Sequence, residues 1–416
     1  MSSEKQSVSV VVFGASKSGK SCLSGHLLFQ LSKIDKKQME RLAHDASQKG
    51  KPDSKFSWIM DELPLEREKS QTIENGICFF ETQSKKVVLL DTPGSKEFIP
   101  TYIAGASQAE HGMLIISAHS PPAKSDQSLN EYLVISKSLG IDSLIVVVNM
   151  LDKIDWSQQK YKEIVSNVSD ILNKFGFKAA QQTFIPCSSW TGDNITLISK
   201  TNTKFNWYKG PTVLAAIDSL QPAQRKVEMD SSFLFSVHEI YKDVLSGMGV
   251  VVCGKVESGW VSKGDKILVL PQNEIVTVKA IKMDGTAVEF GYIGQNIEIA
   301  IVGLDIPQLS IGNVICDPSN PLPMVTKFEA QILTSTDFGF PILQGSQVLL
   351  HIHSSNVVAK IRTLQIIDKK SGILKKPKVL GPQKSAVVLI DIVEPLCLEL
   401  FKTNKSFGRF ILRDYG

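Results

Sequence analysis

The stretch that most constrains this chain lies near its start, where an apolar run leads into a turn rich in glycine and serine. Residues 8–13 read VSVVVF and predict a buried strand, and residues 14–21 continue directly as GASKSGKS. This turn has the G-x-x-x-x-G-K-S spacing of a phosphate-binding loop. Residues 23–31 predict a helix whose N-terminus faces the phosphates. A ligand-free turn is the alternative, but a strand before and a helix after favour the phosphate site.

At several positions of this loop, chemistry explains why the residue type suits a bound phosphate. Gly14 and Gly19 let the backbone wrap a phosphate so that its N–H groups point inward. Lys20 adds positive charge between the outer phosphates, and Ser21 offers a hydroxyl to a magnesium ion. The nucleotide-binding residues predicted from this loop are Gly14, Ser16, Lys17, Ser18, Gly19, Lys20, Ser21 and Cys22.

The composition limits the class of protein. The chain has 416 residues, enough for about two to four domains, and 43% of them are hydrophobic. No apolar run reaches the roughly 18 residues of a transmembrane helix, and the start MSSEKQS has no secretory core. The 6 cysteines form no C-x-x-C pair, which argues against a zinc site or a disulfide framework. We therefore expect a cytoplasmic protein without membrane association, whose net charge of +4 permits an RNA-rich partner.

Residues 1–224 alternate strand-like and helix-like stretches. Strands are expected at 77–81, 86–90, 114–117 and 144–148, in addition to the first strand. A polar, mostly helical insertion is expected at 34–65. This alternation predicts a parallel, doubly wound sheet, whose ligands bind at the carboxyl ends of the strands.

A second motif, Asp-Thr-Pro-Gly at residues 91–94, follows the strand at 86–90. Asp91 can hold a water bound to the metal, and the Gly94 N–H can contact a γ-phosphate. The motif therefore lies where the outer phosphate of a nucleotide is expected.

A third motif, Asn-Met-Leu-Asp at residues 149–152, follows the strand at 144–148. The Asp152 carboxylate can accept hydrogen bonds from N1–H and the exocyclic amine of guanine, a donor pair that adenine lacks. Asn149 can brace the loop, and the backbone of Ser188 could close over the base. An ordinary turn at a strand end is the alternative, but the two preceding motifs favour guanine recognition.

From about residue 225 the helical stretches give way to short strands separated by turns. In the first set they are expected at 233–240, 249–256, 266–270, 275–281 and 296–301, and in the second at 347–351, 357–367, 386–393 and 409–412. We therefore predict an α/β P-loop GTPase domain at 1–224, followed by antiparallel β-barrel domains at 225–322 and 323–416. A basic hairpin at 369–378 either contacts ribosomal RNA or is a solvated tip.

The order of these motifs resembles that of the translational GTPases, in the branch of elongation factor 1-alpha, eukaryotic release factor three and the stalled-ribosome rescue GTPases. Local matches are SGHLL at 24–28, KIDK at 33–36, SWTGDN at 189–194 and GRF at 408–410. The resemblance implies GTP, Mg²⁺ and a ribosomal partner. It also implies that Ser21, Thr72 and Asp91 hold the metal, with Lys20 and Gly94 at the γ-phosphate. The guanine residues that it implies are Asn149, Met150, Asp152, Ser188, Ser189 and Trp190.

Four positions depart from the family pattern. Ser95 stands where the family has a catalytic histidine that positions the attacking water, a loss that costs about 10²- to 10⁴-fold in rate. Ser16 replaces an apolar residue that gates this histidine, and Lys17 replaces an aspartate associated with a monovalent cation. Met150 replaces a lysine, but its thioether can still lie over the base. We therefore predict a protein that binds GTP, lacks a catalytic residue and hydrolyses GTP slowly or not at all.

Because it lacks the catalytic histidine, the chain resembles the superkiller-type GTPase-like factors of fungal messenger RNA surveillance. These factors link stalled ribosomes to the RNA exosome and the superkiller complex in nonstop decay. Their N-terminal region carries the exosome and helicase contacts, and we expect this chain to be the GTPase-like part, acting as a monomer. Two alternatives remain: an active ribosome-dependent GTPase in rescue or termination, and an interaction module with a vestigial nucleotide site.

Overall fold

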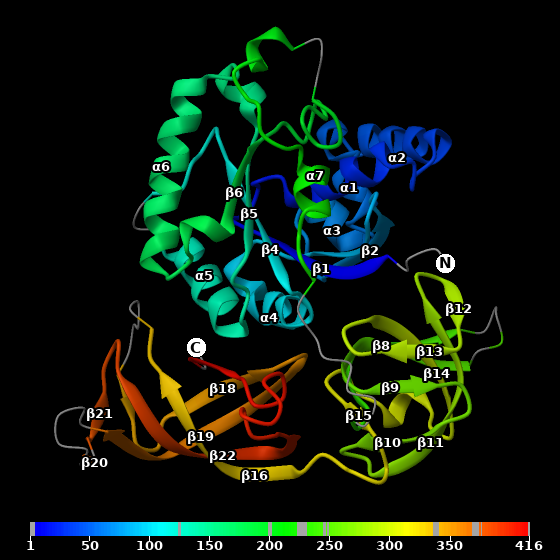
Figure 1. The fold of residues 1–416 in the computed structure, drawn as a ribbon, viewed down its shortest axis with the longest axis vertical. Coiled ribbons are helices and arrows are strands. Elements are labelled where there is room, and N and C mark those ends of the chain that lie inside the picture. The colour runs from blue at the N-terminus through cyan, green and yellow to red at the C-terminus, as the bar shows by residue number, and fades with distance from the viewer. Residues whose placement is uncertain are drawn as a thin grey trace. The chain divides into compact units, whose positions relative to one another are not determined.

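In the computed structural model the chain divides into two compact units, residues 1–224 and 225–416 (Figure 1). The residues that the structure describes are 5–414, except 124–125, 199–201, 223–230, 244–246, 248, 336–340, 368–373 and 376. Most of the basic segment predicted at 369–378 therefore lies outside the described residues. Among the helices that are described, we find none with both the length and the apolar character of a membrane span.

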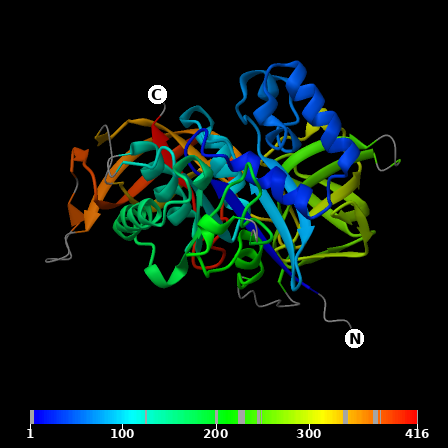
Figure 2. The ribbon, with the colours of Figure 1, turned by 90° about the horizontal axis from the view of Figure 1, so that it is seen from above.

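The first unit is built on a six-stranded sheet with the order β2-β3-β1-β4-β5-β6. Its strands are β1 (Gln6–Phe13), β2 (Gly76–Glu81), β3 (Lys85–Asp91), β4 (His111–Ser117), β5 (Leu144–Asn149) and β6 (Gln182–Pro186). β1 pairs in parallel with β3 and β4, and β5 and β6 continue in parallel. Figure 2 shows β1 running through the middle of this unit.

One edge strand departs from the predicted parallel sheet. β2 is antiparallel to β3, with Gly76 opposite Asp91 and Glu81 opposite Lys86. Only three residues, 82–84, separate the two strands, and a parallel crossover needs a dozen or more. The short connection therefore makes a hairpin, which the alternation of elements alone did not reveal.

Helices pack on both faces of the sheet because successive residues of a strand point to opposite sides. Val12 of β1 belongs to the core that contains Leu27 of α1 (Lys20–Gln30). The ring of the next residue, Phe13, lies 5.7 Å from the Tyr102 ring of α4 (Ile99–Gln108) and 6.4 Å from the Tyr132 ring of α5 (Gln127–Leu139). The helices are α1 (Lys20–Gln30), α2 (Lys36–Gln48), α3 (Pro64–Lys69), α4 (Ile99–Gln108), α5 (Gln127–Leu139), α6 (Gln158–Lys174) and α7 (Val213–Asp218).

The insertion predicted to be mostly helical contains α2 and α3, with two short 3-10 helices, Pro52–Ser54 and Ser57–Ile59, between them. Trp58 is its buried anchor, at 2% exposed. The 3-10 helix Ser57–Ile59 contacts α1, and Met60 after it lies beside Gly76 at the start of β2.

The second unit begins with a closed antiparallel barrel of six strands. Pairing runs in the order β10-β15-β7-β8-β14-β11, and β10 also pairs with β11, which closes the ring. These strands are β7 (Leu234–Asp243), β8 (Gly249–Ser258), β10 (Lys266–Leu270), β11 (Glu274–Met283), β14 (Asn296–Val302) and β15 (Val314–Cys316). β12 (Thr286–Val288) pairs in antiparallel fashion with the end of β11, and β9 (Trp260–Ser262) pairs with β13 (Phe290–Tyr292) in a separate ribbon.

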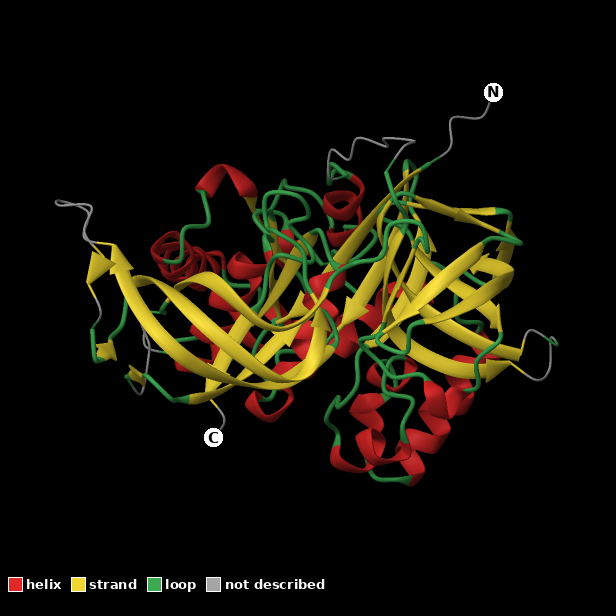
Figure 3. Cartoon of the chain, turned by 90° about the horizontal axis from the view of Figure 1, so that it is seen from below, coloured by secondary structure: helices red, strands yellow, loops and turns green. Residues whose placement is uncertain are grey.

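The remaining residues form a second antiparallel β-domain with the sheet order β16-β22-β19-β18-β23. Its strands are β16 (Met324–Leu333), β18 (Gln347–Ile352), β19 (Ser355–Ile367), β22 (Ser385–Cys397) and β23 (Ile411–Asp414), with the short strands β17 (Ile342–Leu343), β20 (Leu374–Lys375) and β21 (Val379–Leu380). Leu350, Ile361 and Ile390 lie in its aliphatic core. The predicted fold class, an α/β GTPase domain followed by antiparallel β-domains, is confirmed (Figure 3).

Candidate nucleotide-binding site

The phosphate-binding loop joins β1 to α1 and depends on two glycines with positive φ. Gly14 has φ 144°, and a Cβ there would lie 2.4 Å from the carbonyl oxygen of Ile115 in β4. Gly19, with φ 88°, is the N-cap residue of α1, and its Cβ would lie 2.4 Å from Asn149 Nδ2. Only glycine therefore lets this loop approach β4 and the end of β5 so closely, and the N-terminus of α1 opens toward the loop.

Lys20 is the buried cation of the loop. Its side chain is 6% exposed, and its ammonium donates hydrogen bonds to the carbonyls of Gly14 and Ala15, both at 3.1 Å. Burial lowers the pKa of Lys20 to about 8, against the opposing effect of the Asp91 and Asp61 carboxylates. A phosphate bound beside Nζ would favour the charged ammonium, so this environment fits a nucleotide phosphate.

Gly94, after β3, approaches the same lysine from the other side. A Cβ on Gly94 would lie 2.3 Å from Lys20 Nζ and 2.9 Å from the backbone nitrogen of Ser16. The loop after β3 therefore packs directly on the phosphate-binding loop, without room for a side chain. This placement is consistent with the predicted contact between the Gly94 N–H and an outer phosphate.

The three side chains predicted to hold a metal lie around the start of α1. Ser21 Oγ is 2.9 Å from Thr72 Oγ1, and Thr72 donates a hydrogen bond to Asp61 Oδ1 at 2.8 Å. Asp91 Oδ1 accepts from Ser24 at 3.2 Å, whereas its Oδ2 is buried and unpaired among the described residues. Hydroxyl and carboxylate oxygens suit Mg²⁺, which takes its other ligands from phosphates and water. The residues present therefore fit this ion.

Asp61 is a member of this cluster that we did not predict. It is 4% exposed; burial first, and then the charge of Asp91, raise its pKa to about 7. Burial likewise raises the pKa of Asp91 to about 6. Two neighbouring buried carboxylates disfavour each other's charge unless a cation lies close by. Asp61 follows the 3-10 helix Ser57–Ile59 inside the insertion, where no motif pointed to it.

Asn149, at the end of β5, joins three segments of the site. Its Nδ2 donates hydrogen bonds to the Ser18 carbonyl at 2.9 Å and to Ser189 Oγ at 3.0 Å. Its Oδ1 accepts from the backbone N–H groups of Met150 and Ser189, both at 2.8 Å. The side chain is fully buried, and its hydrogen bonds join the phosphate-binding loop to the loop after β6.

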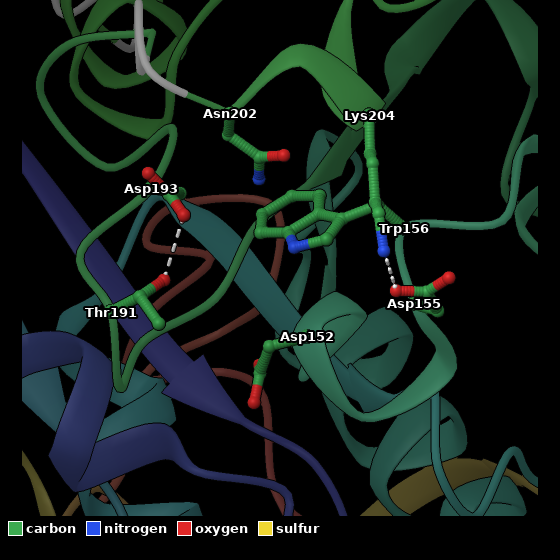
Figure 4. A pocket seen from close by; sticks show the side chains of 7 residues that line it. All are labelled: Asp152, Asp155, Trp156, Thr191, Asp193, Asn202 and Lys204. Atoms are coloured by element: carbon green, nitrogen blue, oxygen red, sulfur yellow. Dashed lines mark hydrogen bonds and ion pairs between the residues drawn. The ribbon is translucent and has the colours of Figure 1, made fainter.

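Asp152 lies in the 3-10 helix Leu151–Ile154, and its Oδ1 is buried without a hydrogen-bond partner in the described part of the chain. It lines an open pocket beside the Asp155–Lys204 ion pair and the hydrogen bond from Thr191 to Asp193 (Figure 4). An unpaired buried carboxylate oxygen is costly, and the N–H donors of guanine would satisfy it. The residues that line the pocket are Asp152, Asp155, Trp156, Thr191, Asp193, Asn202 and Lys204.

The other predicted guanine residues come from the loops after β5 and β6. Ser188 and Ser189 are buried, and the Cys22 thiol of α1 donates to the Ser189 carbonyl at 3.6 Å. Met150 has a left-handed backbone, with φ 63°, and its sulfur accepts a hydrogen bond from Ser117 at 3.4 Å. These loops therefore meet the phosphate-binding loop at the carboxyl ends of the parallel strands.

His26 connects this edge to the insertion, and we did not predict it as a site residue. Its Nδ1 donates to the Ser189 carbonyl at 2.6 Å, and burial lowers its pKa, which favours the neutral ring. The ring stacks on Phe56 at 3.8 Å, and Phe56 meets Trp190 edge-on at 6.2 Å. Trp190, predicted to bind guanine, is 39% exposed and packs on the insertion. The family motif SGHLL at 24–28 contained His26, but it carried no information about this contact.

Three of the four departures from the family pattern, Ser16, Lys17 and Ser95, lie at the phosphate end. Ser16 and Lys17 are exposed, and Lys17 has φ 61°. Ser95 is half-buried, and its carbonyl lies 3.4 Å from the Tyr132 hydroxyl. No imidazole is therefore supplied by the residue that follows Gly94.

Known proteins match this chain over nearly its whole length. Residues 5–223 match the elongation factor Tu GTP binding domain, 249–316 match elongation factor Tu domain 2, and 327–416 match the GTP-eEF1A C-terminal domain-like family. Elongation factor 1-alpha of Ignicoccus hospitalis is 33% identical over 99% of this chain and 94% of its own length. Protein HBS1 of Drosophila melanogaster is 34% identical over 99% of this chain, which spans 62% of HBS1.

Solved structures share the fold. The S. cerevisiae Ski7 GTPase-like domain bound to GTP has a TM-score of 0.78 at 20% identity, over 99% of this chain and 95% of that chain. The bacterial selenocysteine-specific elongation factor EF-Sec has a TM-score of 0.69 at 18% identity, over 99% of this chain and 56% of that chain. The matched domains, the relatives at one third identity and the gathered nucleotide motifs agree: the chain belongs to the translational GTPase family of elongation factors Tu and 1-alpha.

Proposed function

We propose that this protein binds GTP and Mg²⁺, hydrolyses GTP very slowly, and acts in cytoplasmic messenger RNA surveillance at stalled ribosomes. The observation that carries the proposal is a contrast within one site. The side chains suited to phosphate, metal and guanine are present and lie together, whereas Ser95 occupies the position of the family's catalytic histidine. The site is thus suited to holding GTP and poorly suited to hydrolysing it.

The chemistry of Ser95 supports slow hydrolysis. A serine hydroxyl is shorter than an imidazole and does not titrate near neutral pH, where a general base works best. Loss of such a group lowers the rate about 10²- to 10⁴-fold, which is roughly 3–5 kcal/mol of activation free energy. On the exposed loop, the Lys17 ammonium can bind GTP oxygens in place of a monovalent cation. Unchanged GTP affinity in Lys17→Ala would contradict this role.

The proposed partners are the stalled ribosome, the RNA exosome and the superkiller complex, with the chain acting as a monomer in nonstop decay. Their support is the resemblance to the superkiller-type factors at Ser95 and the fold shared with the S. cerevisiae Ski7 GTPase-like domain. In those factors, the exosome and helicase contacts are made mainly by a region N-terminal to the GTPase-like part.

The deciding experiment identifies the nucleotide that co-purifies with the protein, after denaturation and chromatography. Intact GTP is the expected result, since it requires both guanine recognition and absent turnover. GDP would show that hydrolysis survives without the histidine. If the protein carries no nucleotide, a titration with GTP and Mg²⁺ follows, and absence of binding would identify an interaction module with a vestigial site.

A second candidate function is an active, ribosome-dependent GTPase of rescue or termination. The 34% identity to Protein HBS1 of Drosophila melanogaster favours this function. The absence of the histidine does not oppose it, because a catalytic group can be supplied in trans. Single-turnover hydrolysis measured with and without ribosomes separates the two functions. Fast hydrolysis that depends on ribosomes would support this second candidate.

A further inference from the structure

Tyr132 of α5 lies behind the loop that joins β3 to α4. Its hydroxyl is 3.3 Å from the carbonyl oxygen of Pro93 and 3.4 Å from that of Ser95, and its side chain is fully buried. Carbonyl oxygens only accept, so the hydroxyl donates its proton to this pair. The two contacts lie on either side of Gly94 along the chain.

The carbonyl of Pro93 and the N–H of Gly94 belong to one planar peptide unit. This peptide is trans, so the two groups point in opposite directions. A hydroxyl that holds the carbonyl on the α5 side therefore turns the N–H away from α5.

The phosphate-binding loop lies close to this peptide. A Cβ on Gly94 would lie 2.3 Å from Lys20 Nζ and 2.9 Å from the Ser16 nitrogen. We propose that Tyr132 is a positioning residue, which orients the Gly94 N–H toward the terminal phosphate of a nucleoside triphosphate. This proposal rests on the GTP binding proposed above and adds a residue that selects the triphosphate over the diphosphate.

The surroundings of Tyr132 hold its hydroxyl in place. Its ring packs edge-on against Tyr102 at 4.7 Å and lies 6.4 Å from Phe13, and all three rings are fully buried. The loop is also anchored just before Pro93, since the Thr92 hydroxyl donates to the Val12 carbonyl at 2.7 Å. The Pro93–Gly94 peptide is therefore the part of the loop whose orientation depends on Tyr132.

The consequence is selectivity between nucleotides. GDP lacks the γ-phosphate, which is the terminal phosphate of GTP, so a contact between this phosphate and the Gly94 N–H forms with GTP alone. Loss of the Tyr132 hydroxyl leaves this peptide unsupported in both complexes, but only the triphosphate complex loses a hydrogen bond. A merely structural role of Tyr132 would weaken both nucleotides alike.

The test compares Tyr132→Phe with Tyr102→Phe in the full chain. Each variant removes one fully buried hydroxyl and keeps its ring, and the Tyr102 hydroxyl is bound by Ser136 Oγ of α5 at 2.5 Å. The measurement is the Kd for GDP and for a non-hydrolysable GTP analogue in Mg²⁺, with thermal unfolding as a check of folding. We expect Tyr132→Phe to weaken the analogue roughly 2- to 10-fold and to leave GDP binding unchanged. Tyr102→Phe should leave the ratio of the two affinities as it is in the unmodified protein.

An equal loss for both nucleotides, or no loss, in Tyr132→Phe would overturn the proposal. A crystal structure of the unmodified protein with the analogue is a second measurement that needs no variant. There, the Tyr132 hydroxyl should contact the Pro93 carbonyl while the Gly94 N–H contacts the terminal phosphate, and the opposite orientation would also overturn it. Rapid GTP hydrolysis by the unmodified protein would instead contradict the proposed function and leave these affinity ratios valid.

Discussion

Single side chains join distant parts of the nucleotide site. Asn149 uses the nitrogen and the oxygen of its side-chain amide to fix the phosphate-binding loop and the loop after β6. Asp152 keeps a carboxylate oxygen buried and unpaired among the described residues. These two residues do different chemistry although they are three positions apart. The hydrogen bonds of the Asn149 amide are all made within the protein, whereas the buried Asp152 oxygen would gain a partner from a ligand that donates hydrogen bonds.

Asp152→Asn should weaken GTP binding roughly 10- to 100-fold, because the amide replaces one acceptor with a donor that faces the guanine donors. Xanthosine triphosphate, which has a carbonyl where guanine has its amine, should gain affinity for the variant. Competition binding with both nucleotides measures this exchange. Equal weakening of both would place Asp152 outside the base contact.

Ser95→His should raise single-turnover GTP hydrolysis on ribosomes, by up to about 10²-fold, because it restores a group that can position water. Ser95→Ala is the matched control and should leave the rate unchanged, since Ser95 itself is proposed to take no part. A slower rate in Ser95→Ala would show that the serine participates in hydrolysis.

Among the elements, α1 has two functions at once. Its first turn carries Lys20 and Ser21 to the proposed phosphate and metal positions, and its second turn carries His26 to the Ser189 carbonyl of the proposed guanine loop. Through Phe56, the same helix is packed on the insertion that leads to Asp61. The two halves of the nucleotide site are therefore held on one rigid segment.

His26→Ala should release the guanine loop and weaken GTP and GDP by the same factor of roughly 3 to 10, since both share the base. The environment of Trp190 should change with it, because Phe56 separates the two rings. Nucleotide titrations and tryptophan emission measure the two effects. Phe29→Leu, on the same helix, is the control for general loss of packing, and an identical affinity loss there would contradict the specific role of His26.

Much of this arrangement could be predicted from the sequence because the motifs follow strands, and the carboxyl ends of parallel strands meet at one sheet edge. Asp61, His26 and Tyr132 could not be predicted, because each reaches the site only through packing between separate elements, and no motif includes these contacts. The antiparallel pairing of β2 depends on a connection of three residues, 82–84, which the strand-and-helix alternation does not encode.

At the scale of the whole molecule, the second unit contains a buried polar cluster among its apolar cores. His238 Nδ1 lies 2.6 Å from Ser354 Oγ, and His353 Nδ1 lies 4.0 Å from Glu257 Oε1. Burial lowers the pKa of both histidines. The charges of His353 and then Lys255 lower the pKa of His238 further. At His353, the Glu257 carboxylate opposes the lowering of the pKa. The folded chain therefore keeps both rings neutral at pH values where the unfolded chain takes up protons.

The free energy of unfolding should consequently fall as the pH drops below about 6.5, the ordinary pKa of histidine. Thermal unfolding of the full chain at pH 7.5 and pH 5.5 measures this loss. His353→Asn should reduce the pH dependence, and asparagine tolerates the left-handed backbone of this position, φ 49°. The same loss on acidification in both proteins would assign the pH dependence to other groups.

Closure of the six-stranded barrel has a consequence for recognition. A sheet with an open edge can accept an extended peptide as an additional strand, so that its backbone does the binding. In the described strands of this ring, each strand is hydrogen-bonded on both sides, and β10 and β11 complete the circle. A protein that meets the ring itself therefore cannot bind by strand addition, and must contact the outward side chains of the barrel or its loops.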